Sequence, residues 1–151
     1  MLQVFQARSE GVDPGYAFAC IQMALTLFPE LFESIQSDVY QIFHNWLSKI
    51  SSSGRLEMGS AAFEQITSIT RPCPQILYIF GKWLENHNHL VKSAQQQRTA
   101  LMIDPTFIPS RNALERLSRK ICDRLGSLFE IFEILSASQK LKFMKIINFL
   151  I

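Results

Sequence analysis

A short aromatic phrase occurs twice in this chain of 151 residues. The pattern Phe-x-x-Trp-Leu at positions 43–47 returns at positions 80–84. Each copy is followed by a polar break, an alanine-bearing stretch and a proline, Pro72 after the first copy and Pro105 after the second. Self-similarity at a period of about 20–50 residues is typical of stacked supersecondary units. Stacks of this kind usually bind other chains, so the repeat is the most informative feature of the sequence for function.

Apolar residues recur at spacings of three and four along most of the chain, whereas no segment shows the period-two alternation of a strand. Polar, glycine-rich or proline-bearing stretches separate the periodic segments, among them 51–54, 71–74 and 126–127. The sequence therefore predicts an all-α fold of antiparallel helix pairs joined by short turns. We expect helices at 16–28, 30–50, 56–69, 75–85, 90–102, 109–125, 128–135 and 139–150.

Composition limits the possible class of protein. The length fits one domain, and the net charge of +2 with 48% hydrophobic residues gives no electrostatic case for nucleic acid. Neither a signal peptide nor an apolar run of about 20 residues is evident. Three cysteines, Cys20, Cys73 and Cys122, show no metal-binding spacing. We therefore expect buried free thiols in a reducing compartment, and a cytoplasmic protein.

The second copy of the phrase lies within a longer pattern. Its members are Leu77, Phe80, Gly81, Leu84, Ser93, Gln97, Ala100 and Pro105. In this order the chain resembles the tetratricopeptide repeat family, most strongly over 74–105 and more weakly over 16–125, with Ser93 where the family prefers alanine and Gln97 where it has an aromatic residue. The resemblance implies helix–turn–helix units of about 34 residues that stack as an α-solenoid. Gly81 and Ser93 would then lie where the two helices of one unit cross closely.

We interpret residues 1–151 as a single helical-repeat domain. Residues 1–15 form an N-terminal lead, 16–126 hold the repeat-like helix pairs, and 127–151 form apolar C-terminal helices. Within residues 141–151, only Lys142, Lys145 and Asn148 break an otherwise apolar helix. An end helix of a stack normally presents a polar outer face. This segment is therefore either buried by the stack, a surface for self-association or a partner through residues 139–151, or the edge of a longer protein.

The resemblance implies a concave groove lined by the first helix of each unit. Residues four apart share one helix face, which gives a strip of amide, hydroxyl and basic side chains. The strip consists of Gln41, Asn45, Lys49, Tyr78, Lys82, Asn86, Asn112, Arg116 and Arg119. Amides can bond an extended backbone, and lysine and arginine can hold carboxylates. We therefore expect a protein–protein interaction module that binds another polypeptide, and specifically an acidic or C-terminal segment.

The sequence offers little for catalysis. Its histidines, His44, His87 and His89, lack the acids or cysteines that would complete a metal site, and no glycine-rich phosphate loop follows a strand. We expect no enzyme activity, cofactor or metal. Trp46 and Trp83 stand beside leucines, which favours packing over ligand binding.

Two other functions remain open at this point. One is an accessory part of a larger enzyme, because tetratricopeptide stacks resemble the N-terminal arms of some glycosyltransferases. The other is a helical regulator that binds nucleic acid through a cluster that Glu115 and Asp123 interrupt. The basic residues of this cluster are Arg111, Arg116, Arg119, Lys120 and Arg124.

Overall fold

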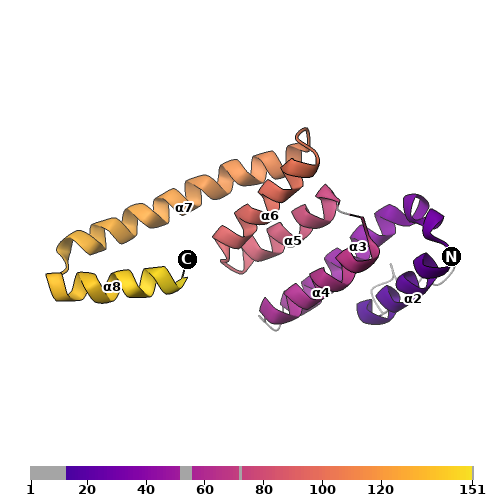
Figure 1. Cartoon of the computed structure of the whole chain (residues 1–151), viewed down its shortest axis with the longest axis horizontal. Helices are drawn as coiled ribbons and strands as arrows, with labels where there is room; N and C mark the ends of the chain where they lie inside the picture. Colours follow the sequence, from indigo (N-terminus) through magenta and orange to yellow (C-terminus); the bar gives the residue numbers. More distant parts are fainter. Residues whose placement is uncertain (1–12, 52–55, 72, 151) are drawn as a thin grey trace.

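The computed structural model describes residues 13–51, 56–71 and 73–150 (Figure 1). Over these ranges the chain is all-α, with seven α-helices, one 3-10 helix and no strand. The elements are α2 (Pro14–Leu27), η1 (Pro29–Leu31), α3 (Phe32–Ser51), α4 (Leu56–Ile69), α5 (Pro74–Asn86), α6 (Leu90–Ile103), α7 (Ile108–Ile134) and α8 (Ala137–Leu150). The all-α prediction is confirmed for this part of the chain.

Prolines mark several helix starts. The first turns of α2, α5 and α7 hold Pro14, Pro74 and Pro109. Proline fits there because its missing N–H has no partner in the first turn of a helix and its fixed φ is already helical. The polar phrase before α6 turns the chain at Asn88, which has a positive φ of 71°. The predicted turns at these places are therefore present.

The helices follow one another along the long axis of the molecule (Figure 1). Helix α3 packs against α2, α4 and α5, and α5 packs in turn against α6 and α7. Helix α7 packs on α6 and then runs on beyond it, and α8 returns beside the outer part of α7 (Figure 1). Packing thus joins successive helices from α2 to α7. It also joins α2 to α4, α3 to α5 and α5 to α7, which are two positions apart in the chain.

The predicted helix break at Gly126-Ser127 is wrong. Helix α7 runs without interruption from Ile108 to Ile134. Gly126 lies in the open, because a Cβ added there would meet nothing within 4 Å. A single exposed glycine weakens a helix by only about 1 kcal/mol relative to alanine, which its helical neighbours outweigh. The boundary expected between residues 126 and 127 therefore falls inside one helix.

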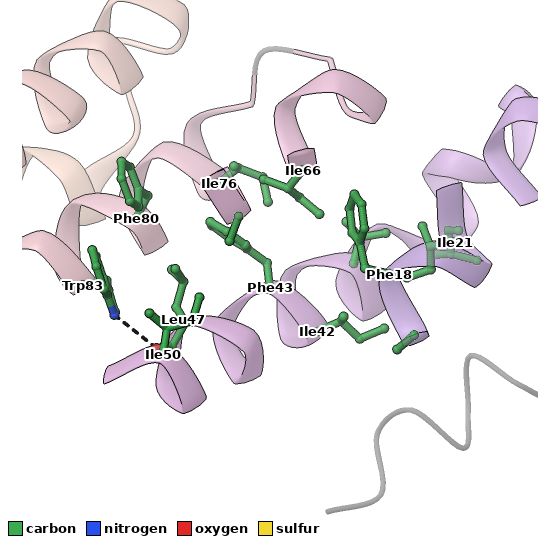
Figure 2. Close-up of a cluster of buried hydrophobic side chains, with 14 of the residues drawn as sticks. Phe18, Ile21, Ile42, Phe43, Leu47, Ile50, Ile66, Ile76, Phe80 and Trp83 are labelled. Atoms are coloured by element: carbon green, nitrogen blue, oxygen red, sulfur yellow. Dashed lines mark hydrogen bonds between the residues drawn. The ribbon is translucent and has the colours of Figure 1, made fainter. Parts of the chain in front are cut away.

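One apolar cluster joins helices α2 to α5 (Figure 2). The repeated phrase contributes Phe43 and Leu47 from α3, and Phe80 and Trp83 from α5, all buried. The Trp83 indole Nε1 donates to the Leu47 carbonyl oxygen at 3.1 Å, so the two copies of the phrase contact each other (Figure 2). Trp46, which is partly buried, packs against the same cluster, and its ring lies 5.2 Å from that of Phe18. Both tryptophans are packing residues, as predicted.

Two glycines permit close approach between helices. A Cβ on Gly59 of α4 would lie 2.2 Å from the Trp83 ring, and one on Gly81 of α5 would lie 2.3 Å from the amide nitrogen of Gln97. Real Cβ atoms do not come this close to a neighbour. Ser93 also meets this crossing, because its hydroxyl donates to the Gly81 carbonyl at 2.7 Å. The expectation that Gly81 and Ser93 lie where α5 and α6 cross is confirmed.

A buried polar group lies between α5, α6 and α7. The amide nitrogen of Gln97 donates to the Tyr78 carbonyl at 3.3 Å, and the Ser110 hydroxyl donates to the Gln97 side-chain oxygen at 2.7 Å. Gln97 and Ser110 are almost completely buried. A buried amide is tolerated when its polar atoms are paired, and Gln97 is paired with both α5 and α7.

The three cysteines are free thiols. Cys20 and Cys73 are partly buried and Cys122 is exposed, so the prediction of burial is wrong for Cys122. The Tyr40 hydroxyl lies 2.8 Å from the Cys73 sulfur, and burial raises the pKa of Tyr40. Within the described ranges no single helix is long and apolar enough to cross a membrane, although α2 and α3, bent by 120°, meet that criterion as a pair.

Candidate functional site

A groove of about 350 Å³ lies between α3 and α5. Polar side chains line most of it, and the apolar ones belong to the core beneath. The lining residues are Ser37, Tyr40, Gln41, His44, Leu47, Ser48, Gln75, Tyr78, Ile79, Lys82, Trp83 and Asn86. Because α3 and α5 each contribute one face, the groove depends on the packing of these two helices rather than on a loop.

On α5 the lining includes all three residues expected there. Tyr78, Lys82 and Asn86 follow one another at intervals of four, which places them on one face of the helix. The Tyr78 ring also meets the edge of Phe107 at 6.0 Å, which fixes it beside the start of α7. The α5 part of the predicted strip therefore coincides with this groove.

On α3 the lining is rotated relative to the predicted strip. Of the three residues expected, Gln41 lines the groove, whereas Asn45 and Lys49 do not. The lining stripe runs instead through Ser37, Gln41, His44 and Ser48. Gln41 bonds to its neighbour, since its amide nitrogen donates to the Asn45 side-chain oxygen at 3.0 Å. The sequence missed His44 and Ser48, and a search for polar residues at alternating intervals of three and four would have found them.

Lys82 is the only lysine or arginine among the residues lining this groove. Its side chain is exposed and makes no ion pair with any residue that the structure describes. An ammonium group provides three donors and a positive charge for a ligand carboxylate. The groove therefore combines one cationic point with hydroxyl and amide groups that can bond a peptide backbone.

The α7 residues of the predicted strip lie elsewhere, and its two arginines are already bonded. Arg116 binds the carboxylate of Glu85 on α5 through two bonds, of 3.0 Å and 2.7 Å. Lys120 donates to the same carboxylate at 2.6 Å. Arg119 pairs with Glu115 at 2.7 Å. Asn112, Arg116 and Arg119 line a shallow hollow of about 250 Å³ on α7, together with two acids. Thus the structure does not bring all nine expected residues into one groove.

Glu85 is another residue whose role the sequence did not indicate. Its side chain is only 6% exposed, and the hydrogen bonds from Arg116 and Lys120 lower its pKa from 4.5 to about 2, against the effect of burial. The Glu85 carboxylate is therefore ionised at neutral pH. It binds the Arg116 guanidinium, the group predicted to bind a ligand. The available signal was an acid beside Asn86 at the end of the strip on α5.

The other basic residues of α7 also bond within the chain. Arg111 donates to the Pro105 carbonyl at 2.7 Å, and Arg124 donates to the side-chain oxygen of Asn88. Together with the pairs of Arg116, Arg119 and Lys120, these bonds engage every member of the proposed nucleic-acid cluster. Because these side chains already bond within the chain, fewer of their N–H groups are free to bond phosphates. Charge–charge attraction to phosphates at longer range remains.

Histidines and acids do not converge on a metal site in the described ranges, where no group of three or more potential ligands is found. The His87 imidazole Nδ1 lies 2.8 Å from the Trp83 carbonyl oxygen, and its ring packs on Trp83 at 4.3 Å. His87 therefore packs against Trp83 at the C-terminal end of α5.

Comparison with protein-family models, with curated proteins and with solved structures found no match for this chain.

Proposed function

We propose that this chain is a protein-interaction module that binds an extended segment of a partner in the groove between α3 and α5. The single observation that carries the proposal is the groove itself, where two helices present hydrogen-bonding side chains around an exposed lysine. Peptide-binding clefts combine such donors and acceptors with side-chain pockets, and the apolar floor at Leu47 and Ile79 supplies the latter.

We further propose that α2 to α7 form a stack of tetratricopeptide-like units. In such a stack α3, α5 and α7 are the first helices of successive units. The packing of α5 against both α3 and α7 supports this assignment. So does the crossing of α5 and α6 at Gly81 and Ser93, where the family places small residues. The groove then lies on the face formed by the first helices.

The preferred ligand is a segment with one carboxylate, either an acidic side chain or a C-terminus. Lys82 is the cationic point of the groove, since Arg116 is held by Glu85. Gln41, Tyr78 and Asn86 can bond the backbone of the ligand on either side. A ligand that needs two cations for a bidentate clamp would fit less well.

Peptides selected from a random library with free C-termini test the proposal. The chosen peptides are labelled, and fluorescence anisotropy measures their affinity for the wild type, for Lys82→Glu and for Arg98→Glu. Arg98 is exposed on α6 and is absent from the groove lining, so its variant controls for the same change of charge. We expect Lys82→Glu to weaken binding by about tenfold or more, the scale of one lost charged contact.

Equal affinity of the Lys82→Glu variant and the wild type would refute the groove assignment. Nuclear magnetic resonance adds an independent measurement: shifts on titration should concentrate on the α3 and α5 residues that line the groove. Shifts confined to α7 and α8 would place the binding surface elsewhere.

A further inference from the structure

The end of α7 and the whole described part of α8 lack a core. No residue between Ser118 and Ile146 is buried. The two helices meet through the rings of Phe132 and Phe143, whose centroids are 6.2 Å apart, and the Lys140 ammonium lies 5.0 Å from the Phe132 ring centre. A pair of helices forms only one contact layer, so it needs another layer to exclude water from both sides.

Large apolar side chains are exposed along both helices of this hairpin. Seven of them are between 45% and 83% exposed. They are Leu125, Phe129, Ile131, Ile134, Leu141, Met144 and Ile146. Typical monomers rarely expose extended apolar patches, and such patches often mark interaction sites. A cleft of about 650 Å³ between α6, α7 and α8, lined mainly by apolar residues, continues this surface toward the repeat-like helices.

The charges of the hairpin are divided between its two helices. Residues 125–134 hold Glu130 and Glu133 and no lysine or arginine, whereas residues 137–146 hold Lys140, Lys142 and Lys145 and no acid. None of these five groups makes an ion pair with another residue in the described part of the chain. The acidic part of α7 therefore matches the basic part of α8 in charge, but the two parts form no ion pairs within one molecule.

We propose that the α7–α8 hairpins of two copies of this chain pack together as a four-helix dimer interface. In a two-fold interface the same patch serves both partners, so each contact occurs twice. Helix α7 of one copy lies against α8 of the other, which brings two glutamates to face lysines and repeats the contact by symmetry. Exposed apolar side chains on the sides of the helices that meet the partner, among them Phe129 and Leu141, fill the centre, as in other four-helix bundles. This inference is independent of the proposed ligand groove.

The first test measures the molar mass of the full chain by sedimentation equilibrium over a range of concentrations. We expect a monomer–dimer equilibrium with a dissociation constant below about 100 μM, the range of a moderate interface. A chain that stays monomeric at every concentration overturns the proposal. This holds even if the hairpin then proves to bind lipid vesicles or a different protein. An open series of larger species overturns it as well, because a two-fold interface closes at the dimer.

Single substitutions then locate the interface. Phe129→Glu and Leu141→Glu place charges at exposed positions of the hairpin, so the monomer should keep its helical circular dichroism while the dimer dissociates. Met102→Glu is the matched control, since Met102 is 83% exposed on α6 and outside the hairpin. Equal dimerisation of all three variants contradicts the proposal.

Charge reversal identifies the occupant as a second copy. One variant carries Glu130→Lys and Glu133→Lys, and the other carries Lys142→Glu and Lys145→Glu. We expect each variant alone to dimerise at least about tenfold more weakly because like charges face each other. A mixture should form a one-to-one heterodimer, since each acidic helix then meets a basic one. A mixture that associates no better than its components overturns the proposal.

Discussion

Two regions of this molecule treat apolar side chains in opposite ways. Between Ala17 and Leu84, apolar residues from four helices form one buried cluster. Between Ser118 and Ile146, residues of the same kinds remain in contact with water. The two regions differ in the neighbours within reach rather than in hydrophobic content. An apolar residue stabilises a fold only when another element covers it.

Helix length explains the difference. Helices α5 and α6 have 13 and 14 residues and cover each other along their lengths, whereas α7 has 27. The buried residues of α7, Ser110, Ala113 and Leu117, all lie in the half that packs on α6. Beyond that half only α8 is available. The comparison between the covered and uncovered regions can be tested by substitutions in matched positions.

The largest expected difference between the two regions comes from removing one aromatic ring in each of them. Phe80 is buried in the cluster and stacks on Phe63 at 4.3 Å, so Phe80→Ala should lower the free energy of unfolding by about 3–5 kcal/mol. Phe129→Ala, at an exposed position, should change it by less than about 0.5 kcal/mol. Urea denaturation at low protein concentration measures both. Similar losses would show that the two regions do not differ as described.

Helical glycines provide a second pair with opposite signs. Gly59→Ala places a Cβ against Trp83, so we expect a loss of about 1–3 kcal/mol despite the better helix propensity of alanine. Gly126→Ala meets open space and should stabilise the chain by about 0.5–1 kcal/mol. Thermal unfolding of the two variants beside the wild type is sufficient. A stabilised Gly59→Ala variant would mean that α4 and α5 are less closely packed.

The buried amide at the junction of α5, α6 and α7 is expected to contribute less than the Phe80 ring. Gln97→Leu leaves the Ser110 hydroxyl without its acceptor and should cost about 1–3 kcal/mol. Adding Ser110→Ala removes the unpaired group, so the double variant should recover part of the loss. A double-mutant cycle of unfolding free energies checks this coupling. Strict additivity would contradict the bond between the two side chains.

The smallest of the expected losses in stability is electrostatic and depends on pH. The pKa of Glu85 is lowered to about 2 in the folded chain, so its contribution is complete above about pH 5 and is lost as the pH falls toward 2. We expect about 1–2 kcal/mol, because the Arg116 and Lys120 side chains are half exposed and water screens the attraction. Glu85→Gln should remove this part of the pH dependence. Unchanged pH profiles of unfolding would show that the ion pairs contribute nothing.

The sequence predicted the helices well because their ends carry local signals. Prolines at helix starts and the polar turn near Asn88 depend on neighbouring residues alone. Gly126 misled the prediction, since glycine is tolerated in an exposed helix that its neighbours favour. The position of a break depends on this balance of local energies, which one residue does not determine.

The groove was less predictable than the helices. The face of α5 follows from its strong apolar stripe, which fixes where Tyr78, Lys82 and Asn86 must lie. The lining of α3 differs by a small rotation that tertiary packing sets. The partner of Arg116 is a residue of another helix, 31 positions away in the chain. Pairing of this kind requires the relative placement of two helices, which no local pattern contains.

The length of α7 has a consequence for assembly. At about 1.5 Å per residue, its 27 residues span roughly 40 Å. If the hairpins join two copies and the groove between α3 and α5 binds a peptide, as proposed, then α7 sets the distance between the two grooves. A ligand with two recognition segments, joined by a linker long enough to span that distance, would then bind both grooves. Its second segment would bind at a high effective concentration. Geometry alone would thus favour bivalent partners over monovalent ones of equal intrinsic affinity.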